Sequence, residues 1–237
     1  MSVLFLFAQY AILVKKGGDG IPMDILYADS HIALCVKPVG LDSEHEVPAA
    51  LKEQLGGDFF TLHRLDRAVG GVMVYARTKE SAAALSKAIQ DGEMIKEYLA
   101  VVHGTPPESG DWEDLLFKDS RKNKVFVVRR ERRGVKKARL TFVRRSQGDT
   151  SLVHIRLYTG RTHQIRVQFA SRGYPLVGDR KYGAKDDETA PMLFSHRLTF
   201  PLNGTAVSFE RCRRVGTRGC DPMLLSPALL KFLFSDR

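Results

Sequence analysis

Short runs of β-branched and aromatic residues alternate with turn residues along most of this chain, a pattern that predicts more strands than helices. Two apolar runs between Ile25 and Pro38, divided by a turn at Asp29 and Ser30, predict a hairpin. Further strands are expected at residues 72–76, 98–102, 151–158, 193–200 and 206–210. Because short turns join most neighbouring elements, we expect a mixed, largely antiparallel sheet.

Apolar residues at helical spacing occur in only a few segments. Between Thr78 and Gln90 they recur at i, i+3 and i+7, and Thr78 is a suitable N-cap. A second helix is expected to begin near Pro48 and end at Gly56, and a short third helix is expected between Gly160 and Gly173. The sequence therefore predicts an α+β fold in which a few helices flank the sheet.

The chain has 237 residues, of which 43% are hydrophobic, enough for one large or two small domains. It shows no internal repeat, no low-complexity linker and no run of about 18 apolar residues that could form a transmembrane helix. Three scattered cysteines, Cys35, Cys212 and Cys220, are too few for a disulfide framework or a paired metal site. We therefore expect a reducing, cytoplasmic setting.

One segment accounts for the net charge of +10. Between Lys118 and Arg145 there are thirteen basic and two acidic residues, so the rest of the chain is close to neutral. The apolar runs at 125–128 and 140–143 predict a hairpin whose strands carry Lys and Arg, although a solvated charged loop is the alternative. A dense basic stretch attracts polyanions because neutralised phosphates release counterions, so we expect a nucleic-acid partner.

Three clusters combine charged residues with glycine or aromatic residues near predicted strand ends. The first is His63-Arg64-Leu65-Asp66-Arg67, followed by Gly70-Gly71 and a strand. A structural ion pair is the simpler explanation for an acid between two arginines. In a loop before a strand, however, Asp66 could face a cleft, and a carboxylate that stays ionised suits a nucleophile.

The other two clusters leave similar alternatives open. Tyr98 shares one side of its strand with Ala100 and Val102, so it is either a core residue or a proton-transfer group. In the third cluster, a turn at Gly160 leads into a helix with Arg161 and Arg166. That arrangement is either an ordinary capped helix with exposed arginines or an anion site that uses free backbone N–H groups.

In this order and spacing, the clusters resemble the signature segments of the RluA-type pseudouridine synthases, which isomerise uridine within RNA. The resemblance extends from Ile25 to about Glu210. Five segments carry it: Lys37-Pro38-Val39-Gly40-Leu41, residues 63–67, Tyr98-Leu99-Ala100, residues 160–166, and residues 173–179 together with Lys181-Tyr182-Gly183. Any one of these segments is a weak signal, whereas all five in sequence are highly specific.

The resemblance implies a fold and a set of site residues. The fold is a bent mixed sheet of two fused halves with flanking helices and a central active-site cleft. Asp66 matches the catalytic aspartate, Tyr98 the tyrosine that stacks on the target uracil, and Arg166 the basic residue that pairs with the carboxylate. Arg64 matches the arginine that fills the gap left by the extruded nucleotide.

The resemblance also implies an RNA partner, either ribosomal or transfer RNA. We expect a cytoplasmic monomer with no membrane attachment. We also expect no metal and no cofactor, because the reaction exchanges bonds within one nucleotide. The residues expected to contact RNA are Arg64, Arg67, Arg161, His163, Arg129, Arg130, Arg132, Arg133, Lys136 and Lys137.

We divide the chain into an N-terminal extension (1–22), a catalytic domain (23–211) and a C-terminal tail (212–237), with no separate N-terminal RNA-binding domain. One departure from the family pattern is Ala68-Val69-Gly70-Gly71, where relatives commonly carry hydroxyl residues just before the last glycine. The alternative function is a catalytically inactive RNA-binding paralogue of the same fold. A methyltransferase is disfavoured because no Gly-rich strand-to-helix loop suits a nucleoside cofactor.

Overall fold

A computed structural model of the chain describes residues 22–202 and 204–211. The expected C-terminal tail, with Cys212 and Cys220, and all of the N-terminal extension except Pro22 lie outside the described residues. In the part of the chain that is described, no helix is both long and apolar enough to cross a membrane.

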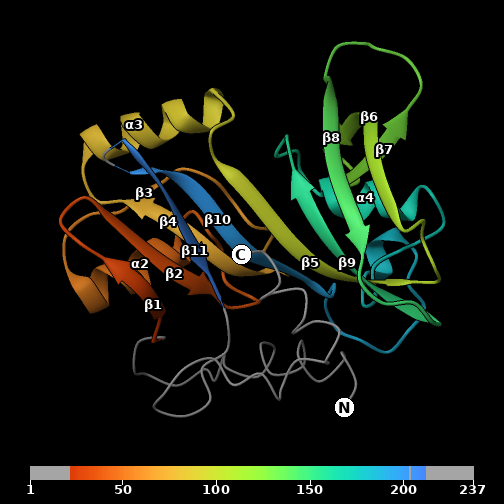
Figure 1. The fold of residues 1–237 in the computed structure, drawn as a ribbon, viewed down its shortest axis with the longest axis horizontal. Helices are drawn as coiled ribbons and strands as arrows, with labels where there is room; N and C mark the ends of the chain where they lie inside the picture. The colour runs from red at the N-terminus through yellow and green to blue at the C-terminus, as the bar shows by residue number, and fades with distance from the viewer. Residues whose placement is uncertain (1–21, 203, 212–237) are drawn as a thin grey trace.

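The fold is a mixed sheet with few helices (Figure 1). Its strands are β1 (Asp24–Ala28), β2 (Ile32–Lys37), β3 (Phe60–Thr61), β4 (Gly70–Ala76), β5 (Ile95–His103), β6 (Ser109–Asp119), β7 (Lys124–Val128), β8 (Val135–Arg144), β9 (Thr150–Leu157), β10 (Leu193–Leu202) and β11 (Thr205–Glu210). Its helices are α2 (Glu46–Leu55), α3 (Lys79–Gln90), α4 (Gln164–Ala170) and the 3₁₀ turn η1 (Arg180–Tyr182).

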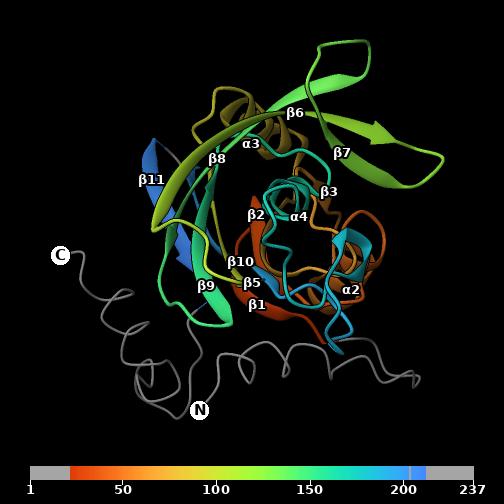
Figure 2. The same cartoon turned by 90° about the vertical axis from the view of Figure 1, so that its right-hand side faces the viewer.

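The strands form one sheet in the order β1-β2-β4-β10-β5-β9-β8-β6-β7, with β3 paired to β4 and β11 to β10. All of these pairs are antiparallel except β4 with β10. The sheet has two halves, which lie on either side of β5 and β10 (Figure 1). The strands β6, β7 and β8 extend away from the rest of the sheet (Figure 2). The predicted α+β class and the mixed, largely antiparallel sheet are confirmed.

Apolar side chains on the two faces of the sheet form separate clusters. On one face, residues of α2 and α4 such as Leu51 and Phe169 pack with Tyr98, Ala100 and Val102 of β5. On the other face, Leu85 of α3 packs against β2, β4 and β10. The central strands are therefore buried on both sides, and the first of these faces carries the residues of the predicted site.

The expected hairpin before Pro38 and the helix after Thr78 are confirmed. The hydroxyl oxygen of Thr78 accepts a hydrogen bond from the N–H of Ser81 at 3.1 Å, as an N-cap does. The helix expected to begin near Pro48 begins at Glu46, two residues earlier. Pro48 still lies in the first turn, where an N–H would have no partner within the helix.

The pairing predicted within the basic segment is wrong. β7 and β8 form strands as expected, but β6 lies between them and pairs with both. Pro106, Pro107 and Gly110 are residues typical of a loop, yet β6 begins at Ser109 and includes Gly110. A Cβ on Gly110 would lie 2.4 Å from Phe142, so this glycine permits close packing within the strand.

The junction between the predicted Asp66 loop and β4 requires a glycine. Gly71 has φ +131°, and a Cβ at this position would lie 2.4 Å from the backbone N and O of Ser195 on β10. The parallel contact of β4 with β10, which joins Gly70 to Phe194 and Gly71 to Ser195, therefore depends on a residue without a side chain.

Candidate active site

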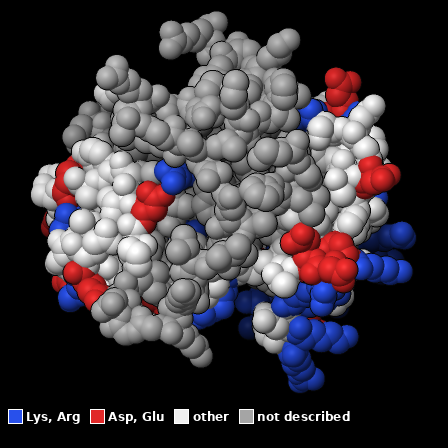
Figure 3. Space-filling model, turned by 90° about the horizontal axis from the view of Figure 1, so that it is seen from below, with Lys and Arg blue, Asp and Glu red and all other residues white. Residues whose placement is uncertain are grey.

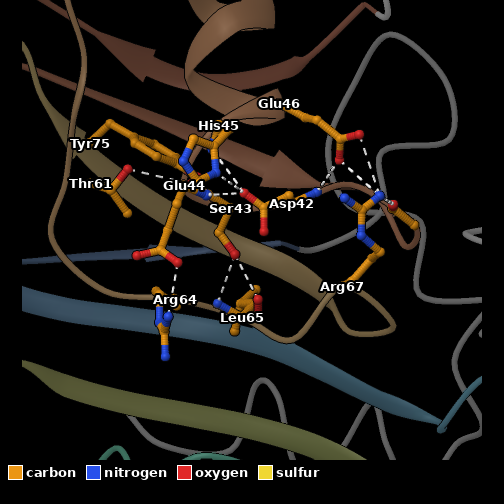
Figure 4. Close-up of polar contacts among 11 residues, drawn as sticks. Asp42, Ser43, Glu44, His45, Glu46, Thr61, Arg64, Leu65, Arg67 and Tyr75 are labelled. Carbon is orange, nitrogen blue, oxygen red and sulfur yellow. Dashed lines mark hydrogen bonds and ion pairs between the residues drawn. The ribbon is translucent and has the colours of Figure 1, made fainter.

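The loop that carries Asp66 is anchored by Ser43 (Figure 4). The buried hydroxyl of Ser43 donates to Leu65 O at 2.6 Å and accepts from Leu65 N at 3.1 Å. The carbonyl of Ser43 accepts from the Tyr75 hydroxyl on β4 at 2.9 Å. The residue before Asp66 is thus held through both of its backbone polar groups.

The two arginines that flank Asp66 pair with other acids. Arg64 contacts Glu44 at 2.8 Å and Arg67 contacts Glu46 at 3.0 Å, both across the segment that leads into α2 (Figure 4). Arg67 also donates to the carbonyl of Gly40 at 2.8 Å. Each flanking arginine therefore has a carboxylate partner other than Asp66.

The guanidinium that reaches Asp66 comes from α4. Arg166 Nη1 donates to Asp66 Oδ2 at 2.9 Å, while Nε and Nη2 bind the two oxygens of buried Asp179 at 2.7 and 2.8 Å. Burial alone would lower the pKa of Arg166, but hydrogen bonds and attraction from Asp179 and Asp66 outweigh it and raise that pKa. A fixed positive charge therefore lies beside the Asp66 carboxylate, whose side chain is 28% exposed.

Tyr98 lies on the same side of β5 as Ala100 and Val102, as the alternation predicted. It is 6% exposed. Burial raises the pKa of Tyr98; a hydrogen bond with Ser195 lowers it, and the charge of Asp66 raises it further. The phenol is therefore neutral at physiological pH.

Asp66, Tyr98 and Arg166 meet in one cleft. The residues that line it come from both halves of the sheet: Arg64, Leu65, Asp66, Val69, Tyr98, Leu157, Arg161, His163, Gln164, Ile165, Arg166 and Leu193. Its apolar members are Leu65, Val69, Leu157, Ile165 and Leu193, and of its charged members Arg166 contacts Asp66 directly.

His163 and Arg161, both predicted to contact RNA, have different surroundings. The side chain of His163 is 10% exposed and its Nε2 lies 3.6 Å from Asp66 Oδ2. Arg161 lines the cleft, and its Nε donates to Lys137 O at 2.9 Å. The side chain of Arg161 has no carboxylate partner among the ion pairs of the described residues, so it can accept an anion.

Two of the backbone N–H groups after Gly160 already have partners. The N–H of Arg161 donates to the side chain of Gln164 at 3.0 Å, and the N–H of Gln164 donates to Arg161 O at 3.1 Å. These two groups are therefore not available to an anion, and the side chains of Arg161 and Arg166 carry the positive charge next to this turn.

The basic residues of the β7–β8 region are exposed. The loop between these strands projects beyond the sheet in Figure 1, and Lys and Arg side chains extend from this half of the molecule in Figure 3. The exposed residues include the six predicted to contact RNA: Arg129, Arg130, Arg132, Arg133, Lys136 and Lys137. The contacts themselves remain predictions.

Sequence reasoning missed several residues that hold the site together. Asp179 lies in a segment that carried the family resemblance, but nothing in the pattern showed that it binds Arg166. Lys37 is fully buried, and its Nζ donates to Pro38 O at 2.9 Å and Arg67 O at 3.3 Å. Burial, with a smaller contribution from Arg67, lowers the pKa of Lys37 to about 8. Ser43 gave no signal, because a single serine before a helix has many roles.

Known proteins resemble this chain in sequence and in fold. A profile of the RNA pseudouridylate synthase family matches residues 31–171. The dual-specificity RNA pseudouridine synthase RluA of Escherichia coli K12 is 32% identical over 202 residues, which cover 78% of this chain and 91% of RluA. An uncharacterized RNA pseudouridine synthase of Aquifex aeolicus is 30% identical, over 81% of this chain and 70% of its own length.

Another relative, the ribosomal large subunit pseudouridine synthase C of Buchnera aphidicola, is 31% identical, and the match spans 62% of its length. Among solved structures, human RNA pseudouridylate synthase domain containing 1 superposes with a TM-score of 0.71 at 22% identity, covering 83% of this chain and 86% of that one. This likeness concerns the fold. Profile, relatives and fold agree with the resemblance seen in the motifs, and the chain belongs to the RNA pseudouridylate synthase family, as an RluA-type member.

Proposed function

We propose that this protein isomerises specific uridines in ribosomal or transfer RNA to pseudouridine, with Asp66 as the catalytic carboxylate. The observation that carries this proposal is the position of Asp66: a partly exposed carboxylate, bound by Arg166 at 2.9 Å, in a cleft that it shares with Tyr98. Membership of the family supports the reaction type. Ribosomal RNA is supported by the name of the Buchnera aphidicola relative, and transfer RNA comes from the resemblance to the RluA-type family.

The reaction breaks the N1–C1′ bond of uridine, turns the base and joins C5 to C1′. Asp66 acts either as a nucleophile toward the ribose or the ring, or as a base that removes a proton at C2′. In each case the Asp66 carboxylate must be ionised and held in a fixed orientation. We assign to Arg166 the role of keeping it so. Tyr98 stacks on the uracil, and we assign its hydroxyl to relaying the C5 proton. The phenol takes up this proton as its own proton passes on, so that the net result is loss of a proton at C5 and gain of one at N1. These steps require no redox group, and we propose that neither metal nor cofactor takes part.

Reaching a uridine in structured RNA requires flipping it out, at a cost of about a few kcal/mol. We assign Arg64, which is exposed at the rim of the cleft, to the space that the nucleotide leaves. Arg67, Arg161 and the exposed residues 129–137 are proposed to bind phosphates. We propose that the protein acts as a monomer in the cytoplasm, where it meets its RNA.

The test is in vitro modification of RNA taken from cells that lack this protein, followed by chemical mapping of pseudouridine. The wild-type protein should create at least one new site, and Asp66→Asn should create none while still binding RNA. Asp58→Asn is a matched control, because Asp58 is an exposed carboxylate that pairs with Lys52 and does not line the cleft. RNA binding without a new pseudouridine from the wild-type protein would favour the inactive paralogue.

A further inference from the structure

The side chain of His163 lies between the catalytic carboxylate and a buried tyrosine. His163 Nδ1 lies 2.8 Å from the hydroxyl of Tyr182, and Nε2 lies 3.6 Å from Asp66 Oδ2. His163 has φ +52°, and in the described residues the only other non-glycine with positive φ is Asn123. This backbone conformation is uncommon for histidine, and here it places the ring just before α4 with its two nitrogens on two different partners.

The hydrogen bonds of Tyr182 define which nitrogen of His163 carries a proton. The Tyr182 oxygen accepts from the backbone N–H of Val125 at 3.0 Å. The hydroxyl proton of Tyr182 is then free to point at His163 Nδ1, the other hydrogen-bond partner of this oxygen in the described part of the chain. Nδ1 therefore accepts, and the proton of the neutral imidazole lies on Nε2, which faces Asp66.

The opposite tautomer would create two conflicts. With a proton on Nδ1, both His163 and Val125 would donate to the Tyr182 oxygen, and no further hydrogen-bond partner of that oxygen among the described residues would accept its hydroxyl proton. The lone pair of Nε2 would then face the Asp66 carboxylate, which is a repulsive contact. Double protonation is also disfavoured, because burial lowers the pKa of His163. Arg166 and Lys181 act in the same direction, while Asp66 and Asp179 oppose them.

We propose that His163 is a positioning residue for Asp66: a neutral imidazole, protonated on Nε2, whose N–H is directed at Asp66 Oδ2 and whose tautomer is set by Tyr182. Arg166 donates to the same oxygen at 2.9 Å. Nε2 of His163 lies 3.6 Å from it, beyond hydrogen-bond distance, so His163 adds electrostatic attraction to the single hydrogen bond from Arg166. This inference rests on the proposed function and adds to it a second support for the catalytic group. It gives His163 a role other than the predicted contact with RNA.

The first experiment reads the tautomer directly in the free protein. Nitrogen-15 NMR of histidine-labelled wild-type protein at pH 7.5 should show a His163 ring protonated on Nε2. Tyr182→Phe keeps the ring beside the Arg166 guanidinium but removes the hydroxyl, so the preference for Nε2 should weaken. Tyr174→Phe is the control, because the Tyr174 hydroxyl forms no hydrogen bond with any described residue. A wild-type ring protonated on Nδ1 would overturn the proposal.

The second experiment measures single-turnover rates on RNA that carries the target uridine. Tyr182→Phe and His163→Asn should each lower the rate constant at saturating RNA about 10-fold, as loss of a supporting partner typically does, and leave the RNA Kd within about 2-fold. Asparagine is chosen because it tolerates positive φ. Weaker RNA binding with an unchanged rate would instead make His163 an RNA contact. If the wild-type protein formed no pseudouridine, the proposed function would fail while the NMR result still stood.

Discussion

Arg166 donates to Asp66 across a sequence separation of 100 residues, and the same guanidinium is held by Asp179 through two further nitrogens. Asp66 belongs to the loop before β4, and Arg166 belongs to α4 in the other half of the sheet. The contact therefore joins the two halves at the point where the substrate base would enter. The planar shape of the Arg166 guanidinium matters here, because this one group binds the carboxylates of Asp66 and Asp179 at the same time.

We expect Arg166→Lys to lower the single-turnover rate at least 100-fold, because an ammonium cannot bind both Asp179 oxygens and also reach Asp66. The melting temperature should also fall, since buried Asp179 would lose a bidentate partner. Arg172→Lys is the matched control. Arg172 binds both oxygens of Asp114 outside the cleft, so that variant should lose stability but keep its rate. Equal rates for the two variants would contradict the role of Arg166.

Ser43→Ala should detach the Asp66 loop from the segment before α2. It removes two hydrogen bonds to the backbone of Leu65 and leaves buried polar groups unpaired, at a cost of about 1–3 kcal/mol in the free energy of unfolding. We expect a lower kcat with little change in RNA affinity. Urea denaturation and single-turnover kinetics measure the two effects, and Ser208→Ala, on exposed β11, provides the reference. Unchanged stability and rate would show that the loop does not depend on Ser43.

Glu44→Gln tests whether Arg64 fills the space that the flipped nucleotide leaves in the RNA. In the free protein Arg64 is tied to Glu44 by an exposed ion pair, which must break before the arginine can enter an RNA helix. Exposed pairs of this kind are weak, so we expect the KM for RNA to fall by about 2- to 5-fold with kcat unchanged. The double variant Glu44→Gln, Arg64→Gln should lose this gain. A gain that persists in the double variant would point to a general effect of removing one negative charge.

The exposed arginines 129, 130, 132 and 133 should contribute to RNA affinity through phosphates. Changing all four to glutamine should weaken binding and reduce the slope of log K against log salt by about 3, since each neutralised phosphate contributes about 0.7–0.9. The melting temperature should stay nearly constant, because these side chains are exposed. The control neutralises Lys52, Lys79 and Lys87 on the helices of the other half. The same loss of affinity in both proteins would indicate non-specific attraction.

Acid should destabilise the protein through two buried histidines whose rings lie 6.5 Å apart. Burial, with nearby positive groups, lowers the pKa of His154 to about 3 and that of His196 to about 4. Both are neutral in the native state, whereas the unfolded chain binds protons below about pH 6.5. The unfolding free energy should therefore be unaffected by these groups above pH 6.5. Below it, the loss should reach at most about 1.4 kcal/mol per pH unit for each histidine, down to about pH 4.

Urea denaturation at pH 7.5, 6 and 5 measures how steeply the free energy of unfolding changes with pH. His196→Gln should reduce the dependence on pH, while His31→Gln, at an exposed position, should leave it as in the wild type. An identical slope in His196→Gln would mean that other groups cause the loss at low pH.

The parts of the fold that the sequence predicted well are those governed by local patterns. The Thr78 cap, the alternation around Tyr98 and the hairpin before Pro38 each depend on a few neighbouring residues. β6 was not predicted because two prolines precede it, a glycine is its second residue, and its strand character depends on pairing with both β7 and β8. Pairing across a sheet is not encoded in the spacing of one segment.

For the candidate site, too, the sequence predicted what local motifs carry and did not predict contacts that form only on folding. The motifs and the resemblance supplied Asp66, Tyr98 and Arg166, and the structure brings these three residues into one cleft. The partners of the flanking arginines could not be predicted, because Glu44 and Glu46 lie about twenty residues away and meet them only after folding. Nor could the sequence indicate the contacts of Tyr182, which depend on Val125 of β7 and His163 before α4.

The place of β10 in the sheet has a consequence for synthesis of the protein. This strand, residues 193–202, inserts between β4 and β5, which both precede it by about a hundred residues. A nascent chain that has not yet released β10 from the ribosome lacks the strand that bridges its two halves. Asp66 and Arg166 would then have no common frame, so we expect catalytic competence to arise late, only after nearly all of the described chain has emerged.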